Sequence, residues 1–360
     1  MISKNFFESL ESIAFERKLE IKEVLQKVEI AMGVACRHAN PPYTGEIILD
    51  LNEERKQIRV FEIKRVVEEI NPDGPRGQIL LEEALELKNN AKIGTEIKTE
   101  VNIQNFGRKA ASNFKQNLLN GLKDLEREKA YVHFTERIGE VITGRVLSVQ
   151  SGFVTFGVGQ NVEAHMPLNE GLPGEEFVVG DEKKLYITKV EKTGKGPKVY
   201  VSRKNKEIVK RLFEMTIPEI KDGTVEIMGL ARDPGSRTKI GVASNNSNVD
   251  AKGACVGPGG LRIRSINEAL NNEKIDIFTW REDPVELICE ALLPAKVVSV
   301  IINDENEKRA MVIVSDDQFS LAIGKQGQNA RLAAYAINWH IDIKKLSDAT
   351  AEGIKFKVNI

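Results

Sequence analysis

Apolar residues recur at helical spacing through the N-terminal part of this 360-residue chain. They form two series: Phe6, Phe7, Leu10, Ile13 and Ala14, followed by Ile21, Val24, Leu25, Val28 and Met32. Because such spacing places each series on one helix face, the pattern predicts two amphipathic helices between Asn5 and about Ala39. The run Asn40-Pro41-Pro42 ends the second helix, since proline has no N–H to donate.

The pattern then changes to alternation and back to helical spacing. Residues 46–51 and 57–67 alternate like strands of a small sheet, with a polar turn at 52–54 between them. Further elements are predicted as a helix over 78–87, an extended segment over 96–101 and a long helix over 106–131. The dense mixture of charges in the long helix is typical of an exposed connector. We therefore expect an N-terminal domain of helices and one sheet.

From Gly139 onward, short β-type segments are separated by glycine turns. They cover residues 140–149, 152–157, 162–166, 184–190 and 197–202. Five such strands fit an OB-type barrel. Phe153 and Phe156 fall on the second strand and His165 on the third, where ribosomal S-one type domains place rings that stack on RNA. Each stack is typically worth about 1 to 3 kcal/mol.

The two phenylalanines cannot both point the same way in a regular strand. They are three residues apart, so alternation puts them on opposite faces of the sheet. We expect one outward and one partly inward, unless a bulge re-aims them. The alternative is that one ring simply fills the barrel core.

The C-terminal half contains a repeat built around two glycine-rich loops. Residues 254–264 read Ala-Cys-Val-Gly-Pro-Gly-Gly-Leu-Arg-Ile-Arg, and residues 321–331 read Leu-Ala-Ile-Gly-Lys-Gln-Gly-Gln-Asn-Ala-Arg. Each copy is predicted as helix, strand, strand, helix, G-x-x-G loop, helix and strand, the order of bacterial-type KH folds. The predicted strands are 224–231, 238–243 and 275–277, then 296–302, 309–314 and 341–343. A helix over 204–215 leads into the first copy without a flexible linker, and Asp316-Asp317-Gln318 resembles a helix N-cap.

A G-x-x-G loop is suited to a phosphodiester backbone. Glycine permits left-handed dihedrals and close approach, and the amides that begin the next helix favour negative charge. In KH modules such a loop holds about four nucleotides of single strand. One such loop could be an ordinary helix junction, but two copies favour binding. The candidate RNA-binding residues are Gly257, Pro258, Gly259, Gly260, Arg262, Arg264, Gly324, Lys325, Gln326, Gly327 and Arg331, with Phe153, Phe156, His165 and Arg203 in the barrel.

The distribution of charge along the chain supports RNA binding, although the net charge of −1 does not. Between Lys183 and Arg211, eleven Lys or Arg stand against two Glu, which gives the segment a net charge of +9. A basic stripe is the footprint of a polyanion-binding face, although a solvated lysine-rich linker would look the same.

Composition argues against several other classes. The chain has no apolar run of the ~18 residues needed to span a bilayer and no signal-like N-terminus, so we expect a cytoplasmic protein without membrane contact. Three scattered cysteines and four unclustered histidines give no disulfide framework or zinc pattern. We therefore expect no metal and no cofactor.

Three longer runs resemble one family closely. Residues 219–227, 232–239 and 320–325 are similar to those of the NusA family of bacterial transcription factors, and the resemblance extends over nearly the whole chain. It implies an α+β multidomain protein: an RNA polymerase-binding domain over 1–135, an S-one type OB domain over 136–203, two tandem type II KH domains over 204–282 and 283–347, and a short tail over 348–360. Phe106-Gly107-Arg108 also matches a run typical of the family.

The resemblance implies a function, and the chain departs from the family pattern at one position. It implies a monomeric RNA-binding elongation factor that docks on the RNA polymerase core, holds nascent single-stranded RNA, modulates pausing, termination and antitermination, and meets other Nus-type factors. The family usually has a basic residue where this chain has Gly259, so we expect Arg262 and Arg264 to compensate. We expect the second loop, which has Lys325, to contribute more of the salt-sensitive affinity.

The residues alone support an enzymatic function less well than a binding function. Exoribonucleases combine similar modules, but residues 1–135 show no Asp cluster for catalysis. A nucleotidase or GTPase would need Lys-Ser/Thr after its glycine loop, and neither loop has it. We therefore expect a binding protein rather than an enzyme.

Overall fold

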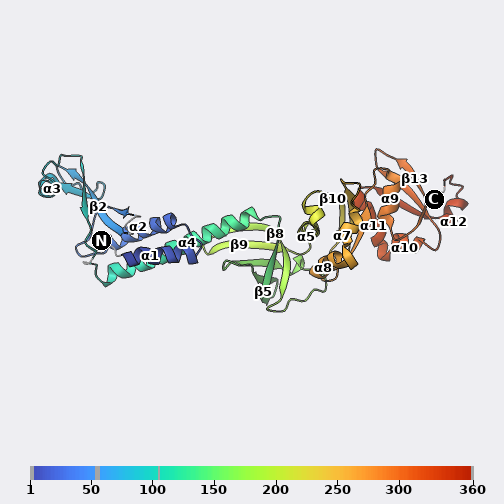
Figure 1. The fold of residues 1–360 in the computed structure, drawn as a ribbon, viewed down its shortest axis with the longest axis horizontal. Coiled ribbons are helices and arrows are strands. Elements are labelled where there is room, and N and C mark those ends of the chain that lie inside the picture. The colour runs from blue at the N-terminus through green and yellow to red at the C-terminus, as the bar shows by residue number, and fades with distance from the viewer. Residues whose placement is uncertain (1–3, 53–56, 104–105, 358–360) are drawn as a thin grey trace. The chain divides into compact units, whose positions relative to one another are not determined.

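A computed structural model describes residues 4–52, 57–103 and 106–357 of the chain. The chain divides into two compact units (Figure 1): residues 1–132 with 194–196, and residues 133–193 with 197–360. Each unit is described by itself below.

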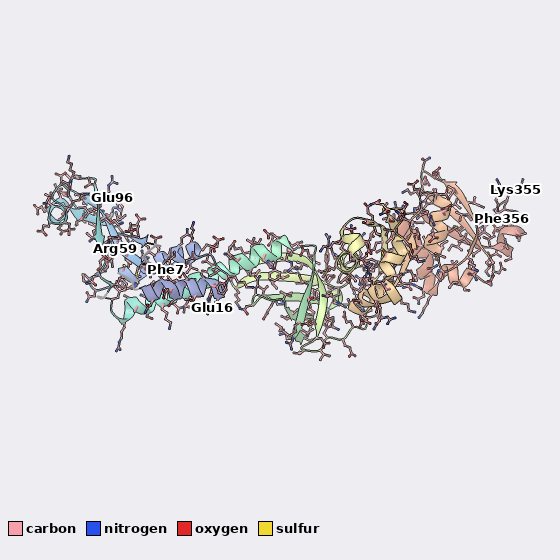
Figure 2. All side chains as sticks on the ribbon, viewed as in Figure 1. Phe7, Glu16, Arg59, Glu96, Lys355 and Phe356 are labelled. Atoms are coloured by element: carbon pink, nitrogen blue, oxygen red, sulfur yellow. The ribbon has the colours of Figure 1, made fainter. Side chains whose placement is uncertain are left out.

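The first unit contains the two predicted amphipathic helices and a four-stranded sheet. The helices are α1 (Lys4–Glu16) and α2 (Ile21–Arg37), and the strands are β1 (Glu46–Asn52), β2 (Gln57–Val67), β3 (Gln78–Leu80) and β4 (Glu96–Glu100). Strand β2 is central, because it pairs antiparallel with β1 and β4 and parallel with β3. Figure 2 labels Arg59 on β2 and Glu96 on β4, and Glu96 lies opposite Arg65 of β2. The turn predicted at 52–54 lies largely outside the described residues.

Two expectations for this unit were wrong in part. Residues 78–87 are not one helix, since Gln78–Leu80 forms β3 and only Leu81–Leu87 forms the helix α3. Pairing of β3 with the end of β2 buries Ile79, a long-range contact that overrides helical spacing. The long helix α4 spans Arg108–Glu136 and is no mere connector, because Leu118 and Leu122 pack into the core with α1 and α2.

The second unit begins with a closed barrel of five strands in the order β5-β6-β7-β9-β8. The strands are β5 (Val141–Gln150), β6 (Phe153–Gly157), β7 (Glu163–Pro167), β8 (Glu182–Thr193) and β9 (Gly196–Ser202). Val146, Val154, Met166, Leu185 and Ile187 are nearly or fully inaccessible to solvent and belong to its core. The predicted OB-type barrel is confirmed.

Two modules with the same element order follow the barrel. The first contains α5 (Glu207–Thr216), α6 (Pro218–Lys221), β10 (Val225–Asp233), β11 (Arg237–Ser244), α7 (Ala251–Val256), α8 (Leu261–Ala269) and β12 (Lys274–Thr279). The second contains α9 (Pro284–Leu292), β13 (Val297–Asp304), β14 (Arg309–Val314), α10 (Phe319–Ile323), α11 (Gln328–Ile337) and β15 (His340–Lys345), and the helix α12 (Leu346–Ala351) follows. In each three-stranded sheet the middle strand pairs antiparallel with the first and parallel with the last. The predicted KH order is confirmed.

The predicted N-cap at 316–318 does not cap α10. Gln318 precedes that helix in a helical conformation and makes no side-chain cap. Instead the Asp316 carboxylate accepts a hydrogen bond of 3.2 Å from the backbone N–H of Ser347, in the first turn of α12. Asp316 therefore stabilises a different helix from the one that sequence position suggested.

The second module packs on the first through α11, which lies against β10 (Figure 1). Gly229 on β10 makes this contact possible, because a Cβ atom there would lie 2.1 Å from the Ala336 carbonyl oxygen. Ala231 and Phe278 of the first module join the hydrophobic core of the second. The two loops are thus carried by modules in direct contact.

Candidate nucleic-acid interface

The two G-x-x-G loops have nearly the same backbone. The φ/ψ angles are 72°/171° at Gly257, 59°/19° at Gly259 and 72°/17° at Gly260. At the matching positions they are 72°/175° at Gly324, 53°/33° at Gln326 and 75°/10° at Gly327. The repeat seen in the sequence is therefore a repeat in three dimensions. In each loop three of the four residues have positive φ, a conformation that favours glycine, and Gln326 is the one residue with a side chain among these six positions.

Both loops are open to solvent at their two middle residues. Pro258 and Gly259 are exposed in the first loop, and Lys325 and Gln326 in the second. No heavy atom lies within 4 Å of the position that a Cβ would take at Gly259. A phosphodiester could approach either loop without displacing protein atoms.

A helix begins immediately after each loop. Neither α8 nor α11 has an acidic residue in its first turn. The unpaired amides at such a helix start carry partial positive charge and favour a phosphate. Each loop therefore combines close backbone access with a favourable field.

One side chain holds each loop from behind. Arg262 lies over Gly257, with its Cγ 2.7 Å from where a Cβ would be, and its Nη1 donates to the Ala254 carbonyl at 2.7 Å. At the matching position, Asn329 lies over Gly324 and its Nδ2 donates to the Ala322 carbonyl at 3.0 Å. Both side chains fasten the end of the preceding helix to the start of the next. We call Arg262 and Asn329 the loop clamps.

The role expected for Arg262 therefore needs correction. Its guanidinium also pairs with Glu219 at 2.9 Å, so it is committed to protein partners on two sides. Arg264, which we expected to share the role, is exposed. Asn329 could not be recognised from the sequence, because its role depends on its burial, with 2% of its surface accessible.

Residues at the start of α11 connect the second loop to the first module. Gln328 donates from Nε2 to Asp233 at 2.6 Å and to Ser236 at 2.8 Å. Arg331, a candidate contact for RNA, pairs with the same Asp233 at 3.4 Å and stays half exposed. The second loop is therefore anchored on the β10–β11 turn of the first module.

In the barrel, Phe153 and His165 form an accessible aromatic pair. Their ring centroids are 6.1 Å apart and the rings meet edge to face. Phe153 is 36% exposed. Partial burial, together with the nearby Lys198 ammonium, lowers the pKa of His165 below its ordinary value. This shift of the pKa favours the neutral imidazole, so the pair is suited to stacking rather than to charge contact.

Phe156 is a correction. It has no accessible surface, and its ring packs edge to face against Phe177 in the barrel interior at 6.0 Å between centroids. The alternation between Phe153 and Phe156 is as expected, but the inward ring is wholly in the core. Phe156 therefore cannot stack on RNA in this structure.

Arg203 is also buried, with 1% of its surface accessible. Its Nε pairs with Glu175 at 2.6 Å, and its other nitrogens donate to the carbonyls of Lys184 and Ala269. Since Ala269 ends α8, Arg203 joins the barrel to the first KH module instead of facing RNA.

A second buried arginine, which the sequence did not reveal, continues this connection. Arg232 pairs with Glu273 at 2.8 Å and donates to the backbone carbonyls of Arg203 and Asn205. Glu273 also accepts from Gly235 N–H and from Thr238. Residues in and next to the β10–β11 turn thus form hydrogen bonds both with the end of the barrel and with the second module.

The basic segment 183–211 is only partly available as a surface charge. Lys189 pairs with Glu191 at 2.6 Å, and Arg211 with Glu214 at 2.6 Å. Lys206 and Lys210 are exposed at the start of α5. The segment belongs to folded strands and a helix, so a solvated linker is not its explanation.

Within the described residues, no group of three or more His, Cys, Asp or Glu side chains could hold a metal ion, and no helix is long and apolar enough to cross a membrane. Cys36 and Cys255 are buried, and burial raises the pKa of each thiol to about 12.

A five-stranded OB-type barrel followed by two KH modules, each with an open glycine loop, defines a multidomain RNA-binding protein. Comparison with known families agrees. Residues 5–128 match the NusA N-terminal domain, 203–280 the NusA-like first KH domain and 284–351 the NusA-like second KH domain. The chain belongs to the NusA family.

Relatives match over almost the whole chain. The transcription termination/antitermination protein NusA of Bacillus subtilis is 42% identical over 353 residues, covering 98% of this chain and 94% of the relative. The protein of the same name from Thermus thermophilus is 36% identical over 363 residues, covering 96% and 92%. The solution structure of the N-terminal domain of NusA from B. subtilis is 28% identical and covers 35% of this chain and 99% of that domain, with a TM-score of 0.26.

Proposed function

We propose that this chain is an RNA-binding transcription elongation factor that docks on RNA polymerase and holds the nascent transcript. It modulates pausing, and it also modulates termination and antitermination, the two processes in the names of its relatives. The work is done by binding, with no covalent bond made or broken. It acts in the cytoplasm as a monomer and meets other Nus-type factors on the polymerase.

The proposed division of labour follows the predicted domains. Residues 1–135 bind the polymerase, while the barrel at 136–203 and the KH modules at 204–282 and 283–347 hold RNA, and 348–360 form a tail. One observation carries the RNA-binding part: two exposed loops of nearly identical, glycine-dependent backbone, each followed by a helix start without acidic residues.

The mechanism depends on where the strand is held. Backbone amides at the two loops donate hydrogen bonds to phosphates, Lys325 adds a full positive charge at the second, and the Phe153 ring offers a sequence-tolerant stacking surface. RNA held in this way cannot freely pair with itself, so the timing of hairpin formation changes. That is sufficient to bias pausing and termination.

Replacing Lys325 and Gln326 together by Asp tests the loop. We expect affinity for single-stranded RNA to fall severely, because two negative charges face the phosphate. The melting temperature should hardly change, since both residues are exposed and Asp tolerates the left-handed conformation at 326. Lys296→Asp, which reverses an exposed charge elsewhere in the module, is the control. Unchanged RNA binding by the double variant would contradict the proposal.

Polymerase docking and enzymatic activity are tested separately. The double variant should still be retained by immobilised core RNA polymerase, because its first unit is unaltered. Labelled RNA incubated with the protein, magnesium and phosphate should stay at full length. A shortened product would favour an RNA-processing enzyme instead.

A further inference from the structure

A carboxylate from the first KH module lies at the start of α11, the helix that follows the second loop. Gln328 is the first residue of α11, and its Nε2 donates to Asp233 Oδ2 at 2.6 Å. Arg331 Nη2 lies 3.4 Å from the same oxygen. A spacing of three residues places Gln328 and Arg331 on one side of the helix. The first turn of α11 has no acidic residue of its own, yet a negative charge from another module faces it.

The first module holds Asp233 in this position. Asp233 is the last residue of β10 and is followed by Pro234, whose ring restricts the backbone. On one side, the neighbouring Arg232 is buried and pairs with Glu273 at 2.8 Å. On the other side, the Gly235 N–H donates to the same Glu273 at 2.8 Å. The backbone around Asp233 is therefore fixed, and its carboxylate stays in front of α11.

The arrangement resembles a phosphate bound at a helix start. A negatively charged oxygen receives a hydrogen bond from a side-chain amide and lies beside a guanidinium, and these are groups that α11 could offer to a phosphate of RNA. Asp233 balances the charge of Arg331. It also repels a phosphate that approaches the same end of the helix. Both effects lower the affinity of the second loop for RNA.

The exposure of the pair limits the size of this effect. The Arg331 and Asp233 side chains keep 50% and 38% of their surface accessible. Exposed ion pairs contribute little, and the upper end of their usual range corresponds to about a fivefold change in an equilibrium constant. Asp233 therefore adjusts the second site and does not close it.

We propose that Asp233 sets the affinity of the second loop, as a carboxylate that takes the place of one phosphate at the start of α11 and keeps Arg331 from RNA. The inference rests on the proposed RNA-binding function and adds to it a limit on how tightly transcript is held. A factor that holds a growing transcript must also let it advance, and a moderate affinity allows faster release. The limit comes from the first module, so it depends on the contact between the two modules.

The test compares Asp233→Asn with the double variant Asp233→Asn, Arg331→Gln in the full chain, with single-stranded RNA over a series of salt concentrations. Asparagine removes the charge and keeps an oxygen that can accept the hydrogen bond from Gln328. Asp233→Asn should bind RNA about two- to fivefold more tightly at about 0.15 M salt. The slope of log K against log salt should increase by about 0.7, because Arg331 can then neutralise a phosphate. The added Arg331→Gln should abolish both gains.

Two further variants separate the charge of Asp233 from a structural role. Asp348→Asn removes an exposed negative charge from α12 and should bind RNA like the wild-type protein. Arg331→Gln alone should reduce the slope by less than it does together with Asp233→Asn. A full reduction of about 0.7 from Arg331→Gln alone would overturn the inference, because Arg331 would then already contact a phosphate in the wild-type protein. Asp233→Asn should melt with the wild-type protein, since the hydrogen bond to Gln328 is kept.

The outcomes distinguish this inference from the proposed function. Unchanged or weaker RNA binding by Asp233→Asn, beside lost binding by the Lys325 and Gln326 double variant, would overturn the role of Asp233 and leave the function standing. Tighter binding that persists after Arg331→Gln would show that Asp233 does not act on Arg331. Absence of RNA binding by the wild-type chain would overturn the function itself.

Discussion

Gly229→Ala should disturb the packing between the two KH modules without changing a residue of either loop. The backbone conformation of Gly229 would allow a side chain, but the opposing helix α11 leaves no space for one. The new Cβ would lie 2.1 Å from the Ala336 carbonyl oxygen and 2.9 Å from Cζ3 of Trp280. Carbon and oxygen approach to about 3.3 Å in close packing, so α11 must retreat by about 1 Å.

The size of the effect follows from what is displaced. Overpacking a core typically costs about 1 to 3 kcal/mol. We expect about 3 kcal/mol here because the nearest atom belongs to the backbone and cannot rotate away. The displaced helix carries the second loop at its N-terminus, so the spacing of the two loops changes as well. A long RNA that engages both should lose at least tenfold in affinity, since two linked sites bind far more tightly than one.

The protein offers its own probe for this change. Its two tryptophans, Trp280 and Trp339, both belong to the core around α11. Urea unfolding followed by tryptophan fluorescence should show a lower midpoint and altered native emission. Gly33→Ala is the control, because the nearest atom to its Cβ is 3.9 Å away and α2 should gain slightly from alanine. An unchanged midpoint and emission spectrum for Gly229→Ala would refute the packing of α11 on β10.

Three further variants test single groups. Arg262→Ala should weaken RNA binding with an unchanged salt slope, because the clamp positions the loop; a slope smaller by about 0.7 would instead reveal a phosphate contact. Gly259→Lys should increase that slope by about 0.7, with a cost of about 1 kcal/mol in stability from the left-handed φ of 59°. Lys239 is 1% exposed, donates to the Leu293 carbonyl at 2.8 Å, and burial lowers its pKa to about 8. The unfolded chain therefore holds the extra proton between pH 8 and about 10.5, and stability relative to Lys239→Met should rise by about 3 kcal/mol over that range. If the urea midpoints of the wild-type protein and Lys239→Met changed by the same amount as the pH was raised, this expectation would be wrong.

Local pattern was sufficient for most elements of the fold. The alternation in 57–67 and the spacing of apolar residues before Asn40 are properties of single segments, and the structure follows them. The repeated loops were visible for the same reason, since glycine recurs at positive-φ positions of both loops, namely 257, 260, 324 and 327. The strand at Gln78–Leu80 was missed because its state depends on β2, a partner outside the segment.

The structural roles of the two buried arginines, Arg203 and Arg232, could not be predicted from the sequence. Arg203 stands in a basic segment and was expected to bind RNA, yet its partner Glu175 and the carbonyl of Ala269 are distant in the chain. Nothing in the neighbouring residues distinguishes a cation with a buried partner from one that faces solvent. Arg232 was part of a run that resembled the family, but the resemblance did not say that it joins two domains.

The loop clamps support the expected balance between the two proposed RNA sites. In the second module a short amide, Asn329, completes the clamp inside the fold, so Lys325 remains exposed for the ligand. In the first module the clamp is Arg262, whose charge is already balanced by Glu219. That leaves Arg264 to compensate for the missing charge at Gly259. The first loop therefore relies on backbone amides and the helix start, and salt should weaken the second site more steeply than the first.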